Sequence, residues 1–458
     1  MVIITELAKN QVHTVKIESY NSEGAGVCRI FGRAVFVDNA IPGETWEILI
    51  LKAGSTAVYG KGIKLLEASP ERIDPACSLF GKCGGCDLMH MSYNEEKRFK
   101  LSRVNEAIAR IAGLNFTIDE IIGAEDYGTH RYRNKAVYAV GRGKDGKAVT
   151  GFYRERSHDI VPAQDCLIQT KLSVKAARAL CEFMDLSGIS AYDESRGTGC
   201  IRHLYTRCSF KFPQSLACLV TVNGLGEHEG ALVEHMRKRC PELSGIVLCV
   251  NKSRGNTVLK GDFYTLWGSE IIEDELCSLK FKISPASFYQ VNPPQAEKLY
   301  ERVRQYAIFE NAGTVLDLYC GTGTISLCLA RHADFVYGAE VNEAAVLNAR
   351  QNAIDNGIKN VEFILGDAYE AARRLEAKGG GNLDAIVVDP PRKGLAPELI
   401  DTIVKMSPKR VVYVSCNPGT LARDLRHFAA ARWFPKAGTA FDMFPRCAHV
   451  ECVVALGL

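Results

Sequence analysis

The sequence predicts a multidomain α/β protein with a small β-barrel at the amino terminus, a central α/β domain and a doubly wound α/β domain at the carboxy terminus. The length of 458 residues exceeds that of one ordinary domain. The first part contains short β-rich runs separated by glycine-bearing turns. From Val315 onward, short apolar runs alternate with longer helical stretches. We place the domains at residues 1–68, 69–285 and 286–458.

The composition is that of a globular protein with substantial cores, since 47% of the residues are hydrophobic and 24% are charged. The start of the chain, "MVIITELAKNQV", lacks the basic stretch and apolar core of a signal peptide. No apolar run approaches the roughly 18 residues that cross a bilayer. We therefore expect a cytoplasmic protein without a membrane partner. The net charge of +3 says almost nothing about other partners.

Cysteine is abundant, with 17 residues. In a reducing compartment, clustered cysteines indicate metal ligands or catalysts rather than disulfides. Cysteines in apolar surroundings, such as Cys181 and Cys218, are expected to be small buried hydrophobes.

The carboxy-terminal third supplies the expected parallel strands. The apolar runs are "TVLDLYC" (314–320), "FVYGAE" (335–340), "VEFILGD" (361–367), "LDAIVVDPP" (383–391) and "RVVYVSC" (410–416). A helix is expected from Asn342, a plausible N-cap, to Ile354. Alternating βαβ units predict a Rossmann-like sheet that binds its ligand at the carboxyl ends of the strands.

Two glycines follow the first of these strands, in "DLYCGTGTISL". Gly321 and Gly323 let the backbone turn tightly and approach a ligand, although a GxG alone is equally compatible with a structural turn. Glu340 ends the next strand, where such sheets place an acid on ribose hydroxyls. Ser326 stands in the place of the third glycine of a dinucleotide fingerprint. The missing diphosphate cradle favours S-adenosylmethionine over NAD.

Two further polar residues end neighbouring strands. Pro390 and Pro391 cannot continue a central ladder, so the chain leaves the sheet there and exposes Asp389. A strand cap with a surface loop is the alternative. Cys416 ends the next strand and is followed by a helical pattern. We expect Asp317, Glu340, Asp389 and Cys416 to gather at one edge of the sheet.

The order of several motifs resembles that of the RNA 5-methyluridine methyltransferases. These motifs are "SFYQVN", "DLYCGTGT", "VDPPRKGL", "VSCNPGTLARDL" and "MFPRCAHVECV". The likeness continues upstream through "CSLFGKCGGC" to an amino-terminal segment similar to a TRAM domain, and so covers nearly the whole chain. It is greatest for the bacterial ribosomal-RNA branch. Cys447 departs from the pattern, because the family more often has threonine there.

The resemblance explains a cysteine at the edge of the sheet. Carbon 5 of uracil is a poor nucleophile, and a thiolate that adds to carbon 6 converts the ring into an enolate that accepts a methyl group. Cys416 is the expected nucleophile, and the helix that begins near Pro418 should favour its thiolate. Glu451, in "HVECVVALGL", is the expected base for the carbon-5 proton, and His449 is the weaker candidate.

The resemblance also implies a cofactor pocket. It places Gln290, Tyr319, Glu340 and Asp389 around S-adenosylmethionine. Asp389 could equally face the uracil, and the sequence does not separate these roles.

Cys77, Cys83 and Cys86 form a C-x5-C-x2-C run in a glycine-rich segment. Three thiolates so close repel one another unless a metal lies between them. Cys166 matches the family's fourth ligand, and His90 is the runner-up. Four cysteines suit either zinc or an iron–sulfur cluster, and the resemblance implies a structural or RNA-positioning [4Fe-4S] cluster.

A basic segment from Tyr127 to His158 is the expected RNA contact, with a solvated hairpin as the alternative. Its cations are Arg131, Arg133, Lys135, Arg142, Lys144, Lys147, Arg154 and Arg156. Its aromatic residues include Tyr132, Tyr138, Phe152 and Tyr153. The first 68 residues carry equal numbers of acidic and basic side chains, so RNA binding there rests on the TRAM resemblance alone.

Together these features predict a monomeric enzyme that uses S-adenosylmethionine to methylate carbon 5 of a uridine in 23S ribosomal RNA. The uridine must be unpaired or flipped, because carbon 6 cannot be attacked within a base stack. The nearest alternative is the same reaction on transfer RNA, whose enzymes generally lack both the TRAM domain and the cysteine cluster. A non-catalytic RNA-binding or assembly factor is the other alternative, but binding alone needs neither Cys416 nor Glu451.

Overall fold

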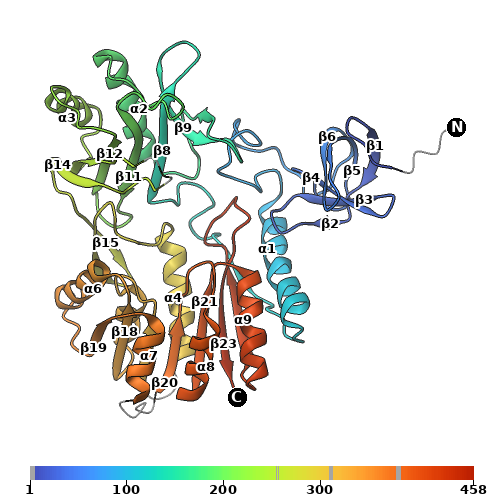
Figure 1. Ribbon diagram of the computed structural model, residues 1–458, viewed down its shortest axis with the longest axis vertical. Coiled ribbons are helices and arrows are strands. Elements are labelled where there is room, and N and C mark those ends of the chain that lie inside the picture. Colours follow the sequence, from blue (N-terminus) through green and yellow to red (C-terminus); the bar gives the residue numbers. More distant parts are fainter. Residues whose placement is uncertain (1–5, 254, 256, 309–312, 378–382) are drawn as a thin grey trace.

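The computed structural model describes residues 6–253, 255, 257–308, 313–377 and 383–458 (Figure 1). Within these residues the strands form four sheets. Figure 1 shows the amino-terminal sheet set to one side, the central sheet above the carboxy-terminal sheet, and helix α1 (Tyr93–Ala107) beside the latter.

The amino-terminal sheet has the strand order β1-β5-β6-β4-β3-β2 and surrounds an apolar core that includes Val35, Val37 and Ile48. Its strands are β1 (Val12–Lys16), β2 (Ser19–Tyr20), β3 (Gly26–Ile30), β4 (Arg33–Val37), β5 (Thr45–Ala53) and β6 (Val58–Glu67). The sequence predicted five strands, and the sixth is the two-residue β2. Residues 1–5 of the predicted domain lie outside the described residues.

The central sheet has the order β10-β9-β8-β11-β12-β13-β14, and helices α2 and α3 pack on one of its faces. Its strands are β8 (Lys135–Arg142), β9 (Ala148–Tyr153), β10 (Ile160–Pro162), β11 (Ile201–Cys208), β12 (Ser215–Thr221), β13 (Gly245–Val250) and β14 (Asp262–Gly268). The helices are α2 (Lys171–Ser187) and α3 (His228–Arg239).

The carboxy-terminal sheet has the order β19-β18-β17-β20-β21-β23-β22-β7. Its strands are β7 (Ile121–Ile122), β17 (Thr314–Leu318), β18 (Phe335–Glu340), β19 (Val361–Leu365), β20 (Leu383–Val388), β21 (Arg410–Ser415), β22 (Phe434–Phe441) and β23 (Glu451–Gly457). The five strands predicted as parallel pair in parallel, and β23 then runs antiparallel to β21. The predicted doubly wound sheet is therefore confirmed.

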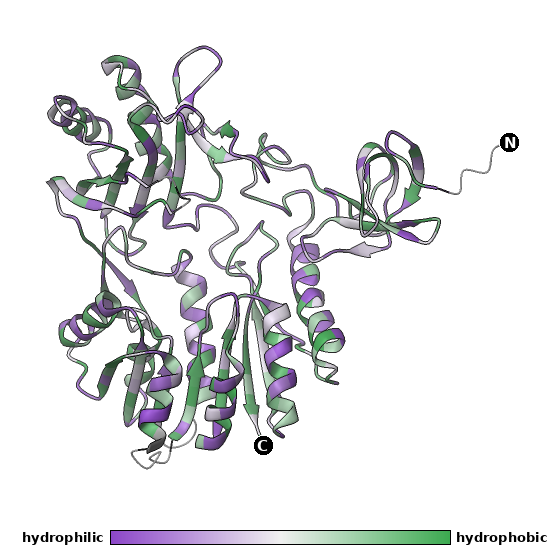
Figure 2. Ribbon diagram, viewed as in Figure 1, coloured by the Kyte–Doolittle hydropathy of each residue, from purple (hydrophilic) through white to green (hydrophobic). Residues whose placement is uncertain are grey.

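Helices cover both faces of this sheet. On one side lie α4 (Pro293–Ala307), α5 (Thr324–Ala330) and α6 (Glu343–Asp355), and on the other lie α7 (Ala368–Ala377), α8 (Pro397–Met406) and α9 (Pro418–Ala430). Along β21, Val412 and Val414 face the α4 side whereas Val411 and Tyr413 face the α9 side. Figure 2 shows apolar residues along these strands, as expected for strands buried on both faces.

Two segments assigned by their position in the chain to the central domain pack with the carboxy-terminal sheet. Helix α1 continues into a π-helical turn, η1 (Ile108–Ala112), whose apolar side joins the core on the α9 side, and β7 pairs with β22. The hairpin β15 (Ile272–Leu276) and β16 (Leu279–Ile283) bonds to the end of α6 through Asn356. Among the described residues, no helix is both long and apolar enough to cross a membrane.

Candidate active site

The loop after β17 lies at the carboxyl edge of the sheet and leaves open space beside Gly321. Tyr319, Gly321 and Gly323 all have positive φ angles, of 69°, 56° and 81°. A positive φ is rare for an aromatic residue and marks strained backbone of the kind found at functional sites. A Cβ on Gly323 would lie 2.7 Å from Phe363, whereas one on Gly321 would meet no atom within 4 Å. The loop is packed on one side and open on the other.

Glu340, at the end of β18, holds this loop. Its Oε2 accepts a hydrogen bond from the Gly321 N–H at 3.1 Å, and its Oε1 accepts one from the Asn342 N–H at 2.8 Å. Asn342 caps α6 as predicted, accepting from the Ala345 N–H at 3.1 Å. Glu340 is therefore fixed beside the open space at Gly321.

Asp317 and Ser326 lie beneath the loop. The Ser326 hydroxyl donates to Oδ2 of Asp317 at 2.5 Å, which explains why the position of the third glycine carries a serine. Oδ1 of Asp317 is buried without a partner in the described part of the chain. Burial raises the pKa of Asp317 to about 7, and it does the same for Asp389 at the end of β20. The charges of Asp389 and Glu340 also raise the pKa of Asp317, so the expected acids do gather at one edge.

Cys416 directly follows β21, and Glu451 is the first residue of the neighbouring strand β23. Ser415 lies opposite Cys452 at the end of the antiparallel ladder, so Cys416 and Glu451 come next to each other just beyond it, close enough for the charge of Glu451 to act on the thiol. Asn417 follows as the N-cap of α9 and accepts from the Gly419 N–H at 3.0 Å. The sheet therefore brings a thiol and a carboxyl together from positions 35 residues apart in the sequence.

The environment of Cys416 differs from the one we predicted. Burial, followed by the charges of Glu451 and Asp389, raises the pKa of the thiol to about 11, although Arg392 opposes this rise. We predicted that the start of α9 would favour the thiolate. The net shift in the substrate-free site runs against that prediction, because burial of the sulfur disfavours the thiolate and the charges of the two carboxyls add to this effect.

Glu451 is half-buried at the start of β23. Burial, with the charge of Asp389, raises its pKa well above the usual range. His449 has a pKa lowered to about 4 by burial and by Arg392, Arg103 and other cations. Arg392 thus faces the site, a role the sequence analysis missed. Its place directly after Asp389-Pro390-Pro391 was the available signal.

Gln290 approaches from the start of α4. Its carbonyl accepts from the Asn134 side chain of the central domain at 2.9 Å, and Asn292 of the same segment donates to the Met443 carbonyl at 3.0 Å. Pro293 and Pro294 open α4 as predicted. This segment therefore joins the central domain to the loop that precedes Glu451.

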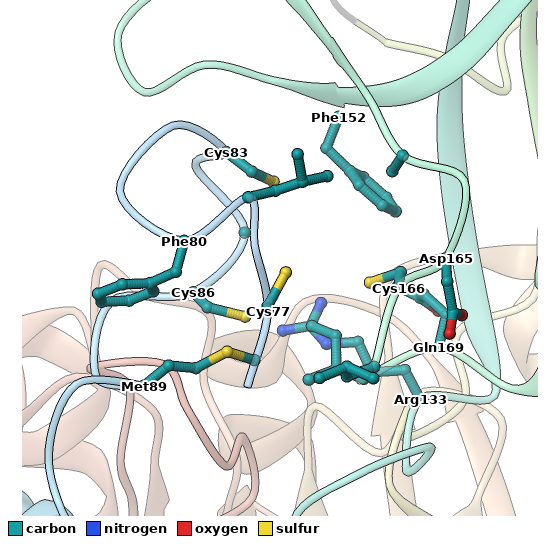
Figure 3. A pocket seen from close by; sticks show the side chains of 15 residues that line it. Cys77, Phe80, Cys83, Cys86, Met89, Arg133, Phe152, Asp165, Cys166 and Gln169 are labelled. Carbon is teal, nitrogen blue, oxygen red and sulfur yellow. The ribbon is translucent and has the colours of Figure 1, made fainter. Parts of the chain in front are cut away.

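The four predicted metal ligands line a single cavity of about 70 Å³. Figure 3 shows the sulfur atoms of Cys77, Cys83, Cys86 and Cys166 facing its interior, with the Arg133 guanidinium nearby. Phe80, Met89 and Phe152 supply apolar walls. Burial raises the pKa of Cys83 and, to about 11, that of Cys166.

The four cysteines are suitable ligands for a sulfur-bound metal or cluster. Their side chains, however, are not grouped closely. Within the described residues, no set of three or more His, Cys, Asp or Glu side chains is close enough to hold a metal ion. The alternative ligand His90 is buried, stacks on Phe80 and is not among the residues that line the cavity. The unexplained Cys447 lies beside the cavity, where its thiol donates to the Gly85 carbonyl at 3.2 Å.

The basic segment is less available to RNA than its composition suggested. Tyr132 and Tyr138 are buried in the core and cannot stack on bases, because the alternation of β8 and the segment before it turns them inward. Arg131 is paired with Asp165 at 2.7 Å, and Arg142 with Asp185 at 2.9 Å. The exposed cations that remain include Lys144, Lys147 and Arg154.

Comparisons with known proteins agree on the type of protein. The pattern of the family described as tRNA (Uracil-5-)-methyltransferase matches residues 247–457, and that of the TRAM domain matches residues 6–63. A protein of Halalkalibacterium halodurans, described as an uncharacterized RNA methyltransferase, is 40% identical over 451 residues, or 98% of each chain. A similarly described protein of Clostridium tetani is 37% identical over 448 residues, covering 98% of this chain and 96% of its own.

A solved structure has the same architecture. The tRNA (uracil-54, C5)-methyltransferase of Pyrococcus abyssi, in complex with S-adenosyl-L-homocysteine, superposes with a TM-score of 0.78 at 28% identity, and covers 97% of this chain and 100% of its own. Its correspondence over nearly the full length, together with the bacterial relatives and the two domain matches, leaves one assignment. The chain belongs to the RNA (uracil-5-)-methyltransferase family and carries an amino-terminal TRAM domain.

Proposed function

We propose that the protein transfers a methyl group from S-adenosylmethionine to carbon 5 of a uridine in 23S ribosomal RNA through a covalent cysteine–uracil intermediate. The observation that carries this proposal is that Cys416, directly after β21, lies beside Glu451 at the start of β23, at the same edge of the sheet as the open space at Gly321 and the carboxylate of Glu340. A thiol and a carboxyl in this place supply the nucleophile and the base that the reaction requires.

The proposed chemistry begins at Cys416. Its thiolate adds to carbon 6 of the uracil, and the electron pair of the 5,6 double bond moves to form an enolate. Carbon 5 then attacks the sulfonium methyl group, and S-adenosylhomocysteine leaves. Glu451 removes the carbon-5 proton, the sulfur–carbon bond to Cys416 breaks, and the double bond of 5-methyluracil re-forms. The raised pKa of Glu451 makes its carboxylate a stronger base than an exposed glutamate.

The cofactor would lie in the open space beside the loop that follows β17. Gly321 leaves that side open, and Glu340 has its carboxylate at the mouth, where ribose hydroxyls can donate to it. The solved relative from Pyrococcus abyssi contains S-adenosyl-L-homocysteine. We assign Gln290, Tyr319, Glu340 and Asp389 to this pocket. The rise in the pKa of Asp389 suits contact with a neutral donor or with the uracil equally well.

We also propose that Cys77, Cys83, Cys86 and Cys166 hold a [4Fe-4S] cluster with a structural role. Support comes from the resemblance and from four thiols on one apolar cavity. Burial raises the pKa of Cys83 and Cys166, so these thiols would release protons on binding metal.

Transfer RNA is the second candidate substrate. The Pyrococcus abyssi enzyme matches this chain over nearly its whole length and acts on tRNA. The presence of an amino-terminal domain ahead of the catalytic domain therefore does not by itself separate the two substrates, contrary to the argument from the sequence. Mapping 5-methyluridine in both RNAs from a strain that lacks the gene decides between them. If 5-methyluridine is missing from the tRNA of that strain but unchanged in its 23S rRNA, the ribosomal assignment is overturned.

The covalent step is tested with Cys416→Ala. This variant should lose methyl transfer by a factor of 1,000 or more, on the order of what a lost covalent nucleophile removes, and still bind S-adenosylmethionine. RNA containing 5-fluorouridine should form a covalent complex with the wild-type protein that survives denaturation, because fluorine replaces the proton that must leave. An adduct of equal stability with Cys416→Ala would place the nucleophile elsewhere.

A further inference from the structure

The segment Asp442–Val450 connects β22 to β23 and ends directly before Glu451. It contains no helix or strand in the structure, so its backbone groups need partners outside regular secondary structure. Most of those partners lie in residues 87–103, in the cysteine-rich loop and helix α1, about 350 positions earlier in the chain. Ile122, Tyr132 and Asn292 bond to the backbone of Asp442, Pro445 and Met443.

A first set of hydrogen bonds holds the peptide groups around Arg446. The Arg446 N–H donates to Oε1 of Glu96 at 2.7 Å, and the Arg446 carbonyl accepts from the N–H groups of Asp87 and Leu88 at 2.9 and 3.1 Å. Lys100 donates to the Phe444 carbonyl at 3.1 Å. Thus one end of the segment is bonded to both the loop and the helix.

The Ala448 peptide is held from two sides. Its N–H donates to Oδ2 of Asp87 at 2.9 Å, and its carbonyl accepts from Nη1 of Arg103 at 2.6 Å. Ala448 is buried, and the neighbouring Cys447 thiol bonds to the Gly85 carbonyl. Only His449 and Val450 separate this clamped peptide from Glu451.

A buried ion cluster fixes the helix against the same segment. Lys100 is fully buried and contacts Oε1 of Glu96 at 2.7 Å and Oδ1 of Asp442 at 2.5 Å, and both acids are fully buried as well. The Tyr93 hydroxyl donates to Oδ2 of Asp442 at 2.7 Å. Removing one member would leave unpaired buried charge, so the cluster acts as a rigid anchor.

We infer that the cysteine-rich loop and α1 position Glu451 for proton abstraction, and that Arg103 and Asp87 are the positioning residues that do so through the Ala448 peptide. This inference rests on the proposed function. Proton transfer requires the base within about 2.6–3.2 Å of the proton-bearing atom, and misplacement by about 1 Å can slow catalysis by about 100-fold. Cys416 directly follows β21 and receives none of these hydrogen bonds. The clamp therefore acts on the release step and not on formation of the adduct.

The test uses Arg103→Met, which keeps the length of the side chain and removes the donor. We expect adduct formation on 5-fluorouridine RNA at close to the wild-type rate and unchanged binding of S-adenosylhomocysteine. On ordinary RNA, product release should slow by about tenfold or more, with accumulation of a covalent methylated intermediate. Asp87→Ala should behave alike, and Asp87→Asn, which keeps an oxygen acceptor, should restore release.

The matched control is Arg110→Met, because Arg110 lies in η1, directly after the same helix, its side chain is 79% exposed and it pairs with Glu106 at 3.5 Å. Release at the wild-type rate by both Arg103→Met and Asp87→Ala would overturn the inference. Equal losses in adduct formation, cofactor binding and release would also overturn it, since they indicate general destabilisation. Failure of the wild-type protein to form any 5-fluorouridine adduct would instead refute the proposed function.

Discussion

Burial raises the pKa of Cys416, Glu451 and Asp389. The charge of Asp389 adds to the rise at Cys416 and Glu451, and the charge of Glu451 adds to it at Cys416, while Arg392 opposes the rise at both residues. Cys416 should react with iodoacetamide faster as the pH rises toward about 11.

Glu451→Gln keeps the size of the side chain and removes its ability to accept a proton. Addition of Cys416 and methyl transfer should still occur, but the carbon-5 proton should remain in place. We expect a covalent, methylated protein–RNA complex to accumulate on ordinary RNA, visible by denaturing electrophoresis with a labelled methyl group. Normal turnover would move the role of base to His449, whose imidazole is neutral above a pKa of about 4, or to water.

Asp389→Asn should stabilise the substrate-free protein at the expense of activity. Because the folded-state pKa of Asp389 is about 7 against 3.8 in the unfolded chain, the wild type loses stability as the pH rises between these values. At pH 8 the variant should gain at most about 4 kcal/mol in the free energy of unfolding. This gain should shrink as the pH falls to 5, as measured by urea denaturation.

Asp384→Asn, on the same strand, is the control of opposite sign. Burial alone would raise the pKa of Asp384, but hydrogen bonds from Lys409 and from the Thr314 N–H, with the charge of Lys409, lower it overall. Its stabilising effect is present above pH 3.8 and is lost as the pH falls through the lowered value. That variant should be less stable than the wild type at pH 8. A loss of stability in Asp389→Asn at pH 8 would contradict the assigned shift.

At the scale of elements, the strands of the carboxy-terminal sheet could be predicted because each is a short apolar run bounded by turn residues. β17, β18, β19, β20 and β21 all begin at the predicted residue. β18 also ends where predicted, whereas the other four end one to three residues earlier, because residues such as Asp389 and Cys416 have already left the ladder. The same polar residues form the candidate site, which is why most of it could be found without coordinates.

Other elements could not be predicted from the sequence, for a physical reason. The segment Asp442–Val450 and the loop around Asp87 have no periodicity, and their conformation depends on hydrogen bonds between residues about 350 positions apart. Tyr132 and Tyr138 of the basic segment were mistaken for residues that stack on bases. Nothing local distinguishes a core tyrosine such as Tyr138 from an exposed one.

At the scale of the whole molecule, the loop of Cys77, Cys83 and Cys86 connects three parts of the fold. Across the cavity it faces Cys166 of the central domain, and through Asp87 it contacts the segment before Glu451. Gly84 also donates to the Tyr153 carbonyl of β9 at 3.0 Å. A metal centre here would tie the catalytic edge to the central sheet without taking part in the chemistry.

Removal of one thiol should therefore loosen this junction. A ligand shared by Cys86 and Cys166 closes a loop of about 80 residues, which restricts the unfolded chain. Protein purified without oxygen should be brown and contain about four irons per chain. Cys83→Ala should lose the colour and the iron, melt at a lower temperature and bind RNA more weakly, while it retains S-adenosylhomocysteine binding in the carboxy-terminal domain.

Cys200→Ala is the matched control for this experiment, because Cys200 is a half-buried cysteine that is not among the residues lining the cavity. It should keep both colour and iron. Anaerobic wild-type protein that is colourless and contains one zinc per chain would refute the iron–sulfur assignment and preserve the ligands. If Cys83→Ala retained all of its iron, the ligand set itself would be wrong, because a cubane held by the remaining three thiols would need another donor from the cavity wall.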